Sequence, residues 1–498
     1  NGASSEGVLI ASAGDDVTIT SAAGTISITG SASGTSGDGV EIEAGIGLAI
    51  DANGGATISI TGTGDEAESA VQIDSLIESE TGTITITSLD GDSTTDDITF
   101  GADGDITSTS GTITLNADNA GTTAEVFMAD GAVINAGTGL IDIDAEVDVT
   151  IGSLVTTTDV QINAIAGAII DGGDANSDIT AATAQLLAEL GIGDAGDANG
   201  QLDTTADATA TSLTIAAETV EGDINVTNTG HLIVGTVNGT VGVTITGADG
   251  VDNVDAINLT ASSPLTVNND VTNNDGGDIT LTATDSAGAG DDLTVATGVS
   301  VTASGGTGNI TLNAGDDVLL NGTALVTAAG SGTVTVTADS GSVDAGGAVS
   351  MADGSQVVSG SGLIDVDATD DVTIGRLVTS GNVTIDTTAG EVIDGGDTHT
   401  EVEADTLTIN SAGGIGEAAG AGADAALETT ISTLNATTTA GTIQIDEADG
   451  ATLASVTAGG AGDVRIVSAA GDLDVQVVAA VGDLVALTAT AGAINDAS

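Results

Sequence analysis

The chain has 498 residues, of which 74 are Asp or Glu and only two are Lys or Arg, so its formal net charge is −72. Two Phe are its only aromatic residues, and it has no Cys. This composition excludes a nucleic-acid binder, which needs cations for phosphates and rings for bases. It also excludes disulfides and thiolate metal sites, and no apolar run is long enough for a transmembrane helix.

Short segments that alternate apolar and polar residues follow one another along the whole chain. The clearest lie at 24–28, 82–86, 111–115, 278–281, 309–312, 333–336 and 382–385. A period of two predicts half-buried β-strands, with Val, Ile or Leu inward and Thr, Ser or Asp outward. The segments recur roughly every 20 to 32 residues, and Gly, Ser and Asp fill the turns between them.

A long internal repeat dominates the middle and the end of the chain. Residues 128–245 match residues 351–466 with an offset of 223 that drifts to about 221. The segment MADG at 128–131 returns at 351–354, and IDGGD at 170–174 returns at 393–397. We therefore expect both copies to share one fold.

The repeat decides one ambiguous segment. Residues 181–190 (AATAQLLAEL) favour helix on intrinsic propensity, but their counterpart 404–413 (ADTLTINSAG) has the pattern of a strand. Since two copies of one unit share a fold, we predict strand for both and let context override propensity.

These patterns predict an all-β protein that forms a single elongated parallel β-solenoid over residues 1–498, with essentially no α-helix. At roughly 24 residues per coil and about 4.8 Å between coils, the chain would form about 20 coils and a rod of roughly 100 Å. A string of β-sandwich domains is the alternative. Sandwiches usually carry a core Trp or Tyr and more Pro-marked turns, and this chain has one Pro and neither ring.

Several segments resemble the repeats of very large bacterial surface proteins. They include GNITLNAGDDVLLNGTALVTAAGSGTVTVTADSGSV at 308–343 and the paired MADG, GLIDIDA and DVTIG units. The family is that of filamentous-haemagglutinin-like and autotransporter-like β-solenoid exoproteins, and the resemblance spans nearly the whole chain. It implies a secreted, elongated, surface-attached molecule used for adhesion, matrix or cell-envelope structure.

Acidic turns are the candidate metal sites. The two Asp-Gly-Gly-Asp turns hold Asp171, Asp174, Asp394 and Asp397. Hard cations such as Ca²⁺ take six to eight oxygen ligands from carboxylates and turn carbonyls, so Ca²⁺ is the one candidate cofactor. The alternative is that these are solvated turns, since Asp and Gly favour turns in any case.

Other chemistry is poorly represented. His399 follows the second acidic turn, but its counterpart is Asn176, so we expect a surface histidine there, and for His231 the sequence indicates nothing. The chain has no nucleophile-elbow motif and no phosphate-binding loop. We therefore expect that it is not an enzyme and has no catalytic residues.

The sequence predicts an extracellular structural protein of a bacterial cell surface. We expect a β-solenoid subunit or segment of a filament, surface layer or stalk that self-associates through strand edges, with Ca²⁺ as the candidate cofactor, or that belongs to a longer chain. The first alternative is an adhesin that binds a receptor or glycan on a host or neighbouring cell. A second is an acidic protein adapted to high salt, consistent with the absence of Lys.

Overall fold

The computed structural model describes residues 6–11, 17–32, 37–45, 48–64, 68–89, 97–117, 123–173, 176–193, 200–247, 255–341, 346–395, 399–416, 426–481 and 484–497. The chain divides into two compact units, unit 1 (Asn1–Ala248) and unit 2 (Asp249–Ser498). Every regular element in the described ranges is a β-strand, which confirms the predicted all-β class. No described segment is a helix long and apolar enough to cross a membrane.

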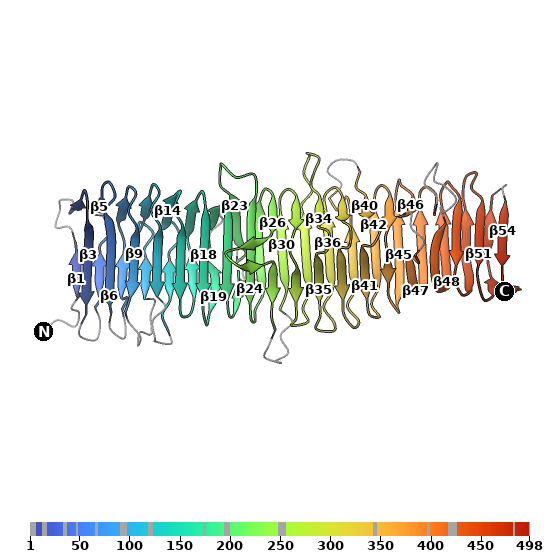
Figure 1. The fold of residues 1–498 in the computed structure, drawn as a ribbon, viewed down its shortest axis with the longest axis horizontal. Coiled ribbons are helices and arrows are strands. Elements are labelled where there is room, and N and C mark those ends of the chain that lie inside the picture. The colour runs from blue at the N-terminus through green and yellow to red at the C-terminus, as the bar shows by residue number, and fades with distance from the viewer. Residues whose placement is uncertain are drawn as a thin grey trace. The chain divides into compact units, whose positions relative to one another are not determined.

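Unit 1 is a parallel β-solenoid whose strands stack in successive coils (Figure 1). Each coil has three strands, so that each strand up to β22 pairs with the third strand after it. One face consists of β3 (Thr25–Ser31), β6 (Thr57–Thr63), β9 (Ile84–Ser88), β12 (Ile113–Ala117), β15 (Ile141–Ala145), β18 (Asp159–Ala164), β21 (Thr183–Ala188) and β24 (Leu213–Thr219). The second face consists of β1 (Val8–Ile10), β4 (Val40–Ile42), β7 (Val71–Ile73), β10 (Ile98–Phe100), β13 (Val126–Met128), β16 (Val149–Ile151), β19 (Ala168–Asp171), β22 (Gly191–Ile192) and β25 (Ile224–Thr229). The third face consists of β2 (Ile19–Ser21), β5 (Leu48–Ala52), β8 (Leu76–Ser79), β11 (Ile106–Ser108), β14 (Val133–Gly137), β17 (Ser153–Thr156), β20 (Ile179–Ala181) and β23 (Leu202–Ala206).

Unit 2 has the same three-strand coil (Figure 1). One face consists of β30 (Ile257–Ala261), β33 (Ile279–Ala283), β36 (Ile310–Ala314), β39 (Val334–Thr337), β42 (Ile364–Ala368) and β45 (Asn382–Thr387). The second face consists of β31 (Leu265–Val267), β34 (Leu293–Val295), β37 (Val318–Leu320), β40 (Val349–Met351), β43 (Val372–Ile374) and β46 (Val392–Asp394). The third face consists of β32 (Val271–Asn273), β35 (Ser300–Ala303), β38 (Leu325–Ala328), β41 (Gln356–Ser359) and β44 (Leu377–Val378). The later strands are β47 (Val402–Ser411), β48 (Leu427–Thr438), β49 (Ile443–Glu447), β50 (Ala451–Ala458), β51 (Val464–Ser468), β52 (Leu473–Val475), β53 (Val478–Ala480), β54 (Val485–Ala489) and β55 (Ile494–Asp496).

Stacking of like on like builds the core. Thr25, Ile26 and Ile28 of β3 lie opposite Thr57, Ile58 and Ile60 of β6, so inward Ile rows and outward Thr rows continue from coil to coil. Successive side chains of a strand point to opposite faces, and the inward rows are almost fully buried. The narrow interior is therefore filled by aliphatic side chains, consistent with the scarcity of aromatic residues.

Coil length varies while the register holds. Thr57 lies opposite Thr25, 32 residues earlier, whereas Asn163 lies opposite Asp144, only 19 residues earlier. The extra residues fall in the turns, because loops tolerate insertion at low entropic cost. Residues that meet across coils therefore have no fixed spacing in the sequence.

The repeat copies have the same strand pattern. β13, β15, β16 and β19 of the first copy correspond, 223 residues later, to β40, β42, β43 and β46. The segment 181–190 contains strand β21, and residues 404–411 of its counterpart lie within strand β47. The prediction of strand over local helix propensity is therefore confirmed in both copies.

A column of glycines allows the coils to approach closely at one corner. A Cβ at Gly111 would lie 1.9 Å from the carbonyl oxygen of Gly82, and one at Gly139 would lie 2.2 Å from that of Gly111. Unit 2 repeats the arrangement, with Gly332 above Gly308 and Gly362 above Gly332, each at 2.1 Å. No side chain fits at these positions without displacing the backbone.

One element departs from the parallel pattern. Strands β27 (Thr236–Val237) and β28 (Thr240–Val241) form an antiparallel hairpin between β26 (Leu232–Val234) and β29 (Val243–Ile245). Its turn is Asn238-Gly239, and both residues have positive φ. Asn-Gly is the strongest short signal for such a turn, so the sequence contains the cue, although the periodicity of the coils masks it.

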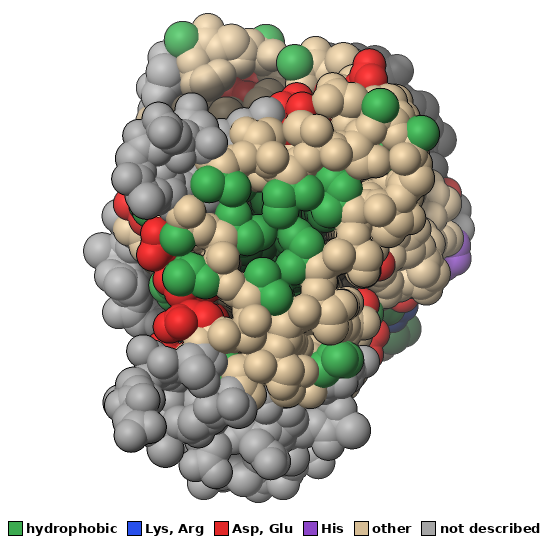
Figure 2. Space-filling model, turned by 90° about the vertical axis from the view of Figure 1, so that its left-hand side faces the viewer, with side chains coloured by type: hydrophobic (Ala, Val, Ile, Leu, Met, Phe, Trp, Pro, Cys, Tyr) green, Lys and Arg blue, Asp and Glu red, His purple; other side chains and the backbone are tan. Residues whose placement is uncertain are grey.

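The first described coil of unit 1 has an open edge. Val8 and Ile19 are only half-buried, whereas their partners in the next coil, Val40 and Ile50, are fully buried. Figure 2 views this side and shows apolar side chains gathered at its centre. In unit 2, the strand residues Val485 and Ile494 are likewise exposed.

Candidate metal centre

A glycine turn at the end of β46 places Asp394 at a corner of unit 2. Gly395 follows directly, and its N–H donates to the carbonyl oxygen of Ile374 in the preceding coil at 3.1 Å. A Cβ on Gly395 would lie 2.6 Å from that oxygen, so the turn accepts only glycine there. The Asp394 side chain is 9% exposed and is thus held inside the corner.

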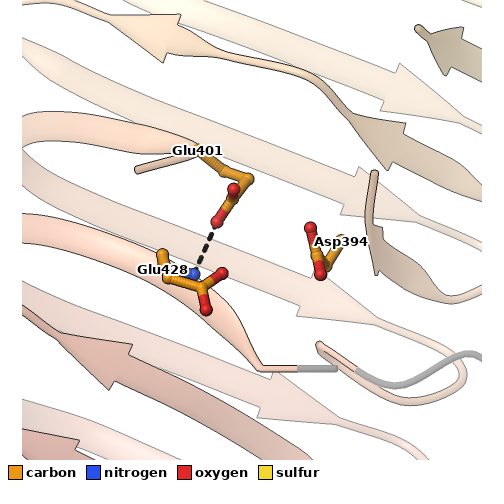
Figure 3. A group of neighbouring side chains, drawn as sticks. All are labelled: Asp394, Glu401 and Glu428. Atoms are coloured by element: carbon orange, nitrogen blue, oxygen red, sulfur yellow. Dashed lines mark hydrogen bonds between the residues drawn. The ribbon is translucent and has the colours of Figure 1, made fainter. Parts of the chain in front are cut away.

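Glu401 and Glu428 lie opposite each other in successive coils at the same corner. They directly precede Val402 and Thr429, which pair in the register of β47 and β48. The Glu401 N–H donates to the carbonyl oxygen of Glu428 at 3.0 Å. In return the Glu428 N–H donates to Glu401 Oε2 at 2.6 Å, the contact drawn in Figure 3.

The three carboxyl groups converge. Asp394, Glu401 and Glu428 each offer an oxygen, and these oxygens lie within 4.8 Å of one another (Figure 3). Two ligands of a Ca²⁺ ion at about 2.4 Å can be no further apart than about 4.8 Å. Oxygen-only, anionic ligands are those that hard divalent cations prefer. Among the described residues, no other set of three His, Cys, Asp or Glu side chains is brought this close.

The electrostatics of this carboxylate cage (Asp394, Glu401 and Glu428) favour the uptake of either a proton or a cation. Glu401 is 1% exposed, and its Oε1 is buried with no hydrogen-bond donor among the described residues. Burial raises the pKa of Glu401 well above its usual range, and the charges of Glu428 and Asp394 raise it further. At an effective dielectric constant of about 20, two carboxylates about 4.8 Å apart repel by about 3 kcal/mol. A divalent cation would remove this repulsion and supply the missing partner.

Both arginines of the chain pair with carboxylates outside the cage. Arg376 Nη2 contacts Glu403 Oε1 at 2.6 Å, and Arg465 Nη1 lies 3.8 Å from Asp446 Oδ1. Asp446 in turn lies opposite Glu428 in the register of β48 and β49. These two ion pairs therefore involve none of the three members of the cage.

The first repeat copy holds the same arrangement with shorter side chains. Asp171 corresponds to Asp394, and Asp178 corresponds to Glu401. The N–H of Asp203 donates to Asp178 Oδ2 at 2.6 Å, as that of Glu428 does to Glu401. Asp178 is 1% exposed, and burial, together with the charges of Asp171 and Asp203, raises its pKa. Both copies thus bury an acidic corner, but only the Glu residues of unit 2 bring three oxygens within 4.8 Å.

Two of the four candidate residues from the sequence can be placed. Asp394 lies in the cage and Asp171 lies in its counterpart, whereas Asp174 and Asp397 lie outside the described residues. Sequence reasoning missed Glu401 and Glu428, which come together only through the coil register. Glu401 directly precedes a strand, and its counterpart in the first repeat copy, Asp178, is also acidic. An acidic residue kept at this position in both copies is the sequence signal that could have identified Glu401.

Comparison with protein-family models, with curated proteins and with solved structures gives no match for this chain.

Proposed function

We propose that this chain is a structural segment of an extracellular bacterial filament, surface layer or stalk, in which a bound divalent cation links successive coils. The stacked coil architecture of each unit is the observation that carries the proposal. A solenoid coil contacts only its neighbours, so the fold extends by adding coils and suits an elongated support.

The exposed strand edges support the stacking of further coils, supplied by another copy or by more of the same chain. A strand edge presents unpaired N–H and C=O groups that template another strand. Here the edge of the first described coil also presents half-buried Val8 and Ile19, and the edge in unit 2 presents Val485 and Ile494. An added parallel strand with the same alternation of polar and apolar residues would pair with the backbone groups of these edges and cover their apolar side chains.

The carboxylate cage supports the role of the cation. Glu401 and Glu428 come from different coils, so an ion bound between them cross-links the stack in addition to the backbone ladder. Three carboxylates leave room for water ligands around Ca²⁺, which accepts six to eight oxygens. With a net charge of −72, the chain also gains from any cation that lowers its self-repulsion.

Negative-stain electron microscopy tests this proposal. The purified chain is imaged with Ca²⁺ and with chelator, beside an E401Q/E428Q variant whose fold is checked by circular dichroism. Fibres or sheets of the wild type would support assembly, and monomeric particles at high concentration in Ca²⁺ would contradict it. Because the cage lies within one chain, the role of the cation is read from thermal unfolding of the same samples. Ca²⁺ should raise the unfolding midpoint of the wild type and not that of E401Q/E428Q, and an equal rise in both would contradict only the role of the cation.

A further inference from the structure

A polar pocket of about 590 Å³ opens on the surface of unit 2 beside the cage. It spans three successive coils, since β41 pairs with β44 and β44 pairs with β47. Pockets of about 300–1,000 Å³ are the usual size for small-molecule ligands. The lining residues are Asp353, Gly354, Gln356, Gly375, Arg376, His399, Thr400 and Glu403.

An ion pair holds the only guanidinium of this pocket in place. Arg376 Nη2 contacts Glu403 Oε1 at 2.6 Å, and both side chains remain 39% exposed. A guanidinium has five N–H donors in a fixed fork, and this contact engages one of its nitrogens. Among the described residues this is the one ion pair of Arg376, and at 39% exposure its side chain can be reached by an anion that enters the pocket.

The first repeat copy separates what the fold needs from what this pocket adds. Backbone-forming positions are shared, such as Gly375 with Gly152. Some polar groups of the lining are shared, such as Asp353 with Asp130, but others differ: Arg376 and His399 replace Ser153 and Asn176 of the first copy. Likewise, the counterparts of Gln356 and Glu403 are Val133 and Thr180. Since both copies form the same coils, the solenoid itself does not require these side chains.

The concentration of rare residues strengthens this point. The whole chain has two Arg and two His, and one of each lines this single pocket. In so acidic a chain, a cationic side chain is the unusual feature of this pocket. Charges more than about 8 Å away have limited influence on it, because salt at physiological concentration screens them. Arg376 is thus the positive group that a small anion would meet here, beside the carboxylates of Asp353 and Glu403.

We propose that this pocket binds a sugar acid, a hexuronate residue whose carboxylate pairs with Arg376. Arginine forms two parallel hydrogen bonds with a carboxylate, which fixes its orientation. The oxygens and amide of Asp353, Gln356 and Thr400 suit the hydroxyl groups of a sugar, which both donate and accept. The inference goes beyond the structural role and does not depend on it, so either can fail alone.

Ligand-observed NMR and calorimetric titration with galacturonate and glucuronate test the proposal, with neutral galactose as the comparison ligand. The variants are R376S and H399N, which install the residues of the first copy, and R465S, which removes the other arginine outside the pocket. We expect hexuronate binding that R376S weakens at least tenfold, that H399N weakens and that R465S leaves unchanged. Circular dichroism confirms that each variant is folded.

Three outcomes would overturn the proposal. They are absence of hexuronate binding at millimolar concentrations, equal binding of galactose and hexuronates, and equal losses in R376S and R465S. The last would indicate a diffuse effect of charge in place of a site. Assembly seen by microscopy is independent of each of these outcomes.

Discussion

The backbone N–H of Glu428 donates a hydrogen bond of 2.6 Å to the side chain of Glu401 in the neighbouring coil. This contact ties an almost fully buried carboxylate to the next coil and turns its second oxygen toward other acids. The same contact joins Asp203 to Asp178 in the other repeat copy. The repeat therefore preserves a buried acidic corner, and several consequences can be measured.

We expect E401Q to be more stable than the wild type in chelator and less stable than the wild type in Ca²⁺. In chelator, folding must either bury the Glu401 charge or protonate a carboxyl that is ionised in the unfolded chain. E401Q removes this cost, so the free energy of unfolding should rise by about 1–3 kcal/mol. In Ca²⁺ at a hundredfold excess over Kd, the wild type should gain about 2.7 kcal/mol that E401Q lacks. Thermal unfolding under both conditions measures this crossing, and a variant less stable than wild type in both would contradict it.

Exchanging side-chain length between the repeat copies tests the geometry of the cage. E401D/E428D gives unit 2 the aspartates of unit 1 and withdraws each carboxylate by about 1.5 Å. We expect Ca²⁺ affinity to fall at least tenfold, whereas the matched D178E/D203E variant keeps the wild-type site. Unchanged affinity in E401D/E428D would mean that Ca²⁺ binds elsewhere.

The glycine column predicts position-specific sensitivity. Gly111→Ala would place a Cβ 1.9 Å from a backbone oxygen, so we expect a loss of about 1–3 kcal/mol in unfolding free energy. Gly55→Ala is the control, because its Cβ would meet only Thr81 Oγ1, at 3.8 Å. Chemical denaturation compares the two variants. Equal stability would refute the close approach of the coils at this corner.

An acidic cluster in unit 1 predicts a pH dependence. Burial, and then Asp38 among nearby charges, raises the pKa of Glu41 to about 7. A carboxyl group whose pKa is higher in the folded than in the unfolded chain contributes its full stabilisation below the unfolded-state pKa. That contribution is lost as pH rises through the folded-state pKa. Stability should therefore fall as pH rises toward about 8.

Glu41→Gln tests the source of this dependence, since Gln72 already occupies the equivalent position of the next coil. With allowance for solvent screening, we expect E41Q to be about 1 kcal/mol more stable than wild type near pH 8. Near pH 4, where Glu41 is protonated in both states, the two should agree. A constant difference at all pH values would assign the effect to packing.

Much of the fold follows from the sequence because a solenoid repeats local rules. Alternation at 25–31 and 57–63 indicates strands, and the repeat converts the helix-like 181–190 into strand β21. The Asn238-Gly239 hairpin was missed because its strands have two residues each, too few for a periodic signal.

The sequence predicts only part of the carboxylate cage, for a related reason. Asp394 stands in a repeated turn motif, but Glu401 and Glu428 are 27 residues apart. Since coil length varies between turns, pairing across coils cannot be counted from the sequence. Register, which backbone hydrogen bonding sets, was the missing information.

Calorimetric titration of Ca²⁺ into the folded chain, with Mg²⁺ and salt present to saturate diffuse acidic sites, tests the central claim most directly. The account predicts one tight Ca²⁺ per chain that is lost in E401Q/E428Q and retained in the matched D178N/D203N variant. Ca²⁺ binding of equal strength and stoichiometry in wild type and E401Q/E428Q would contradict it.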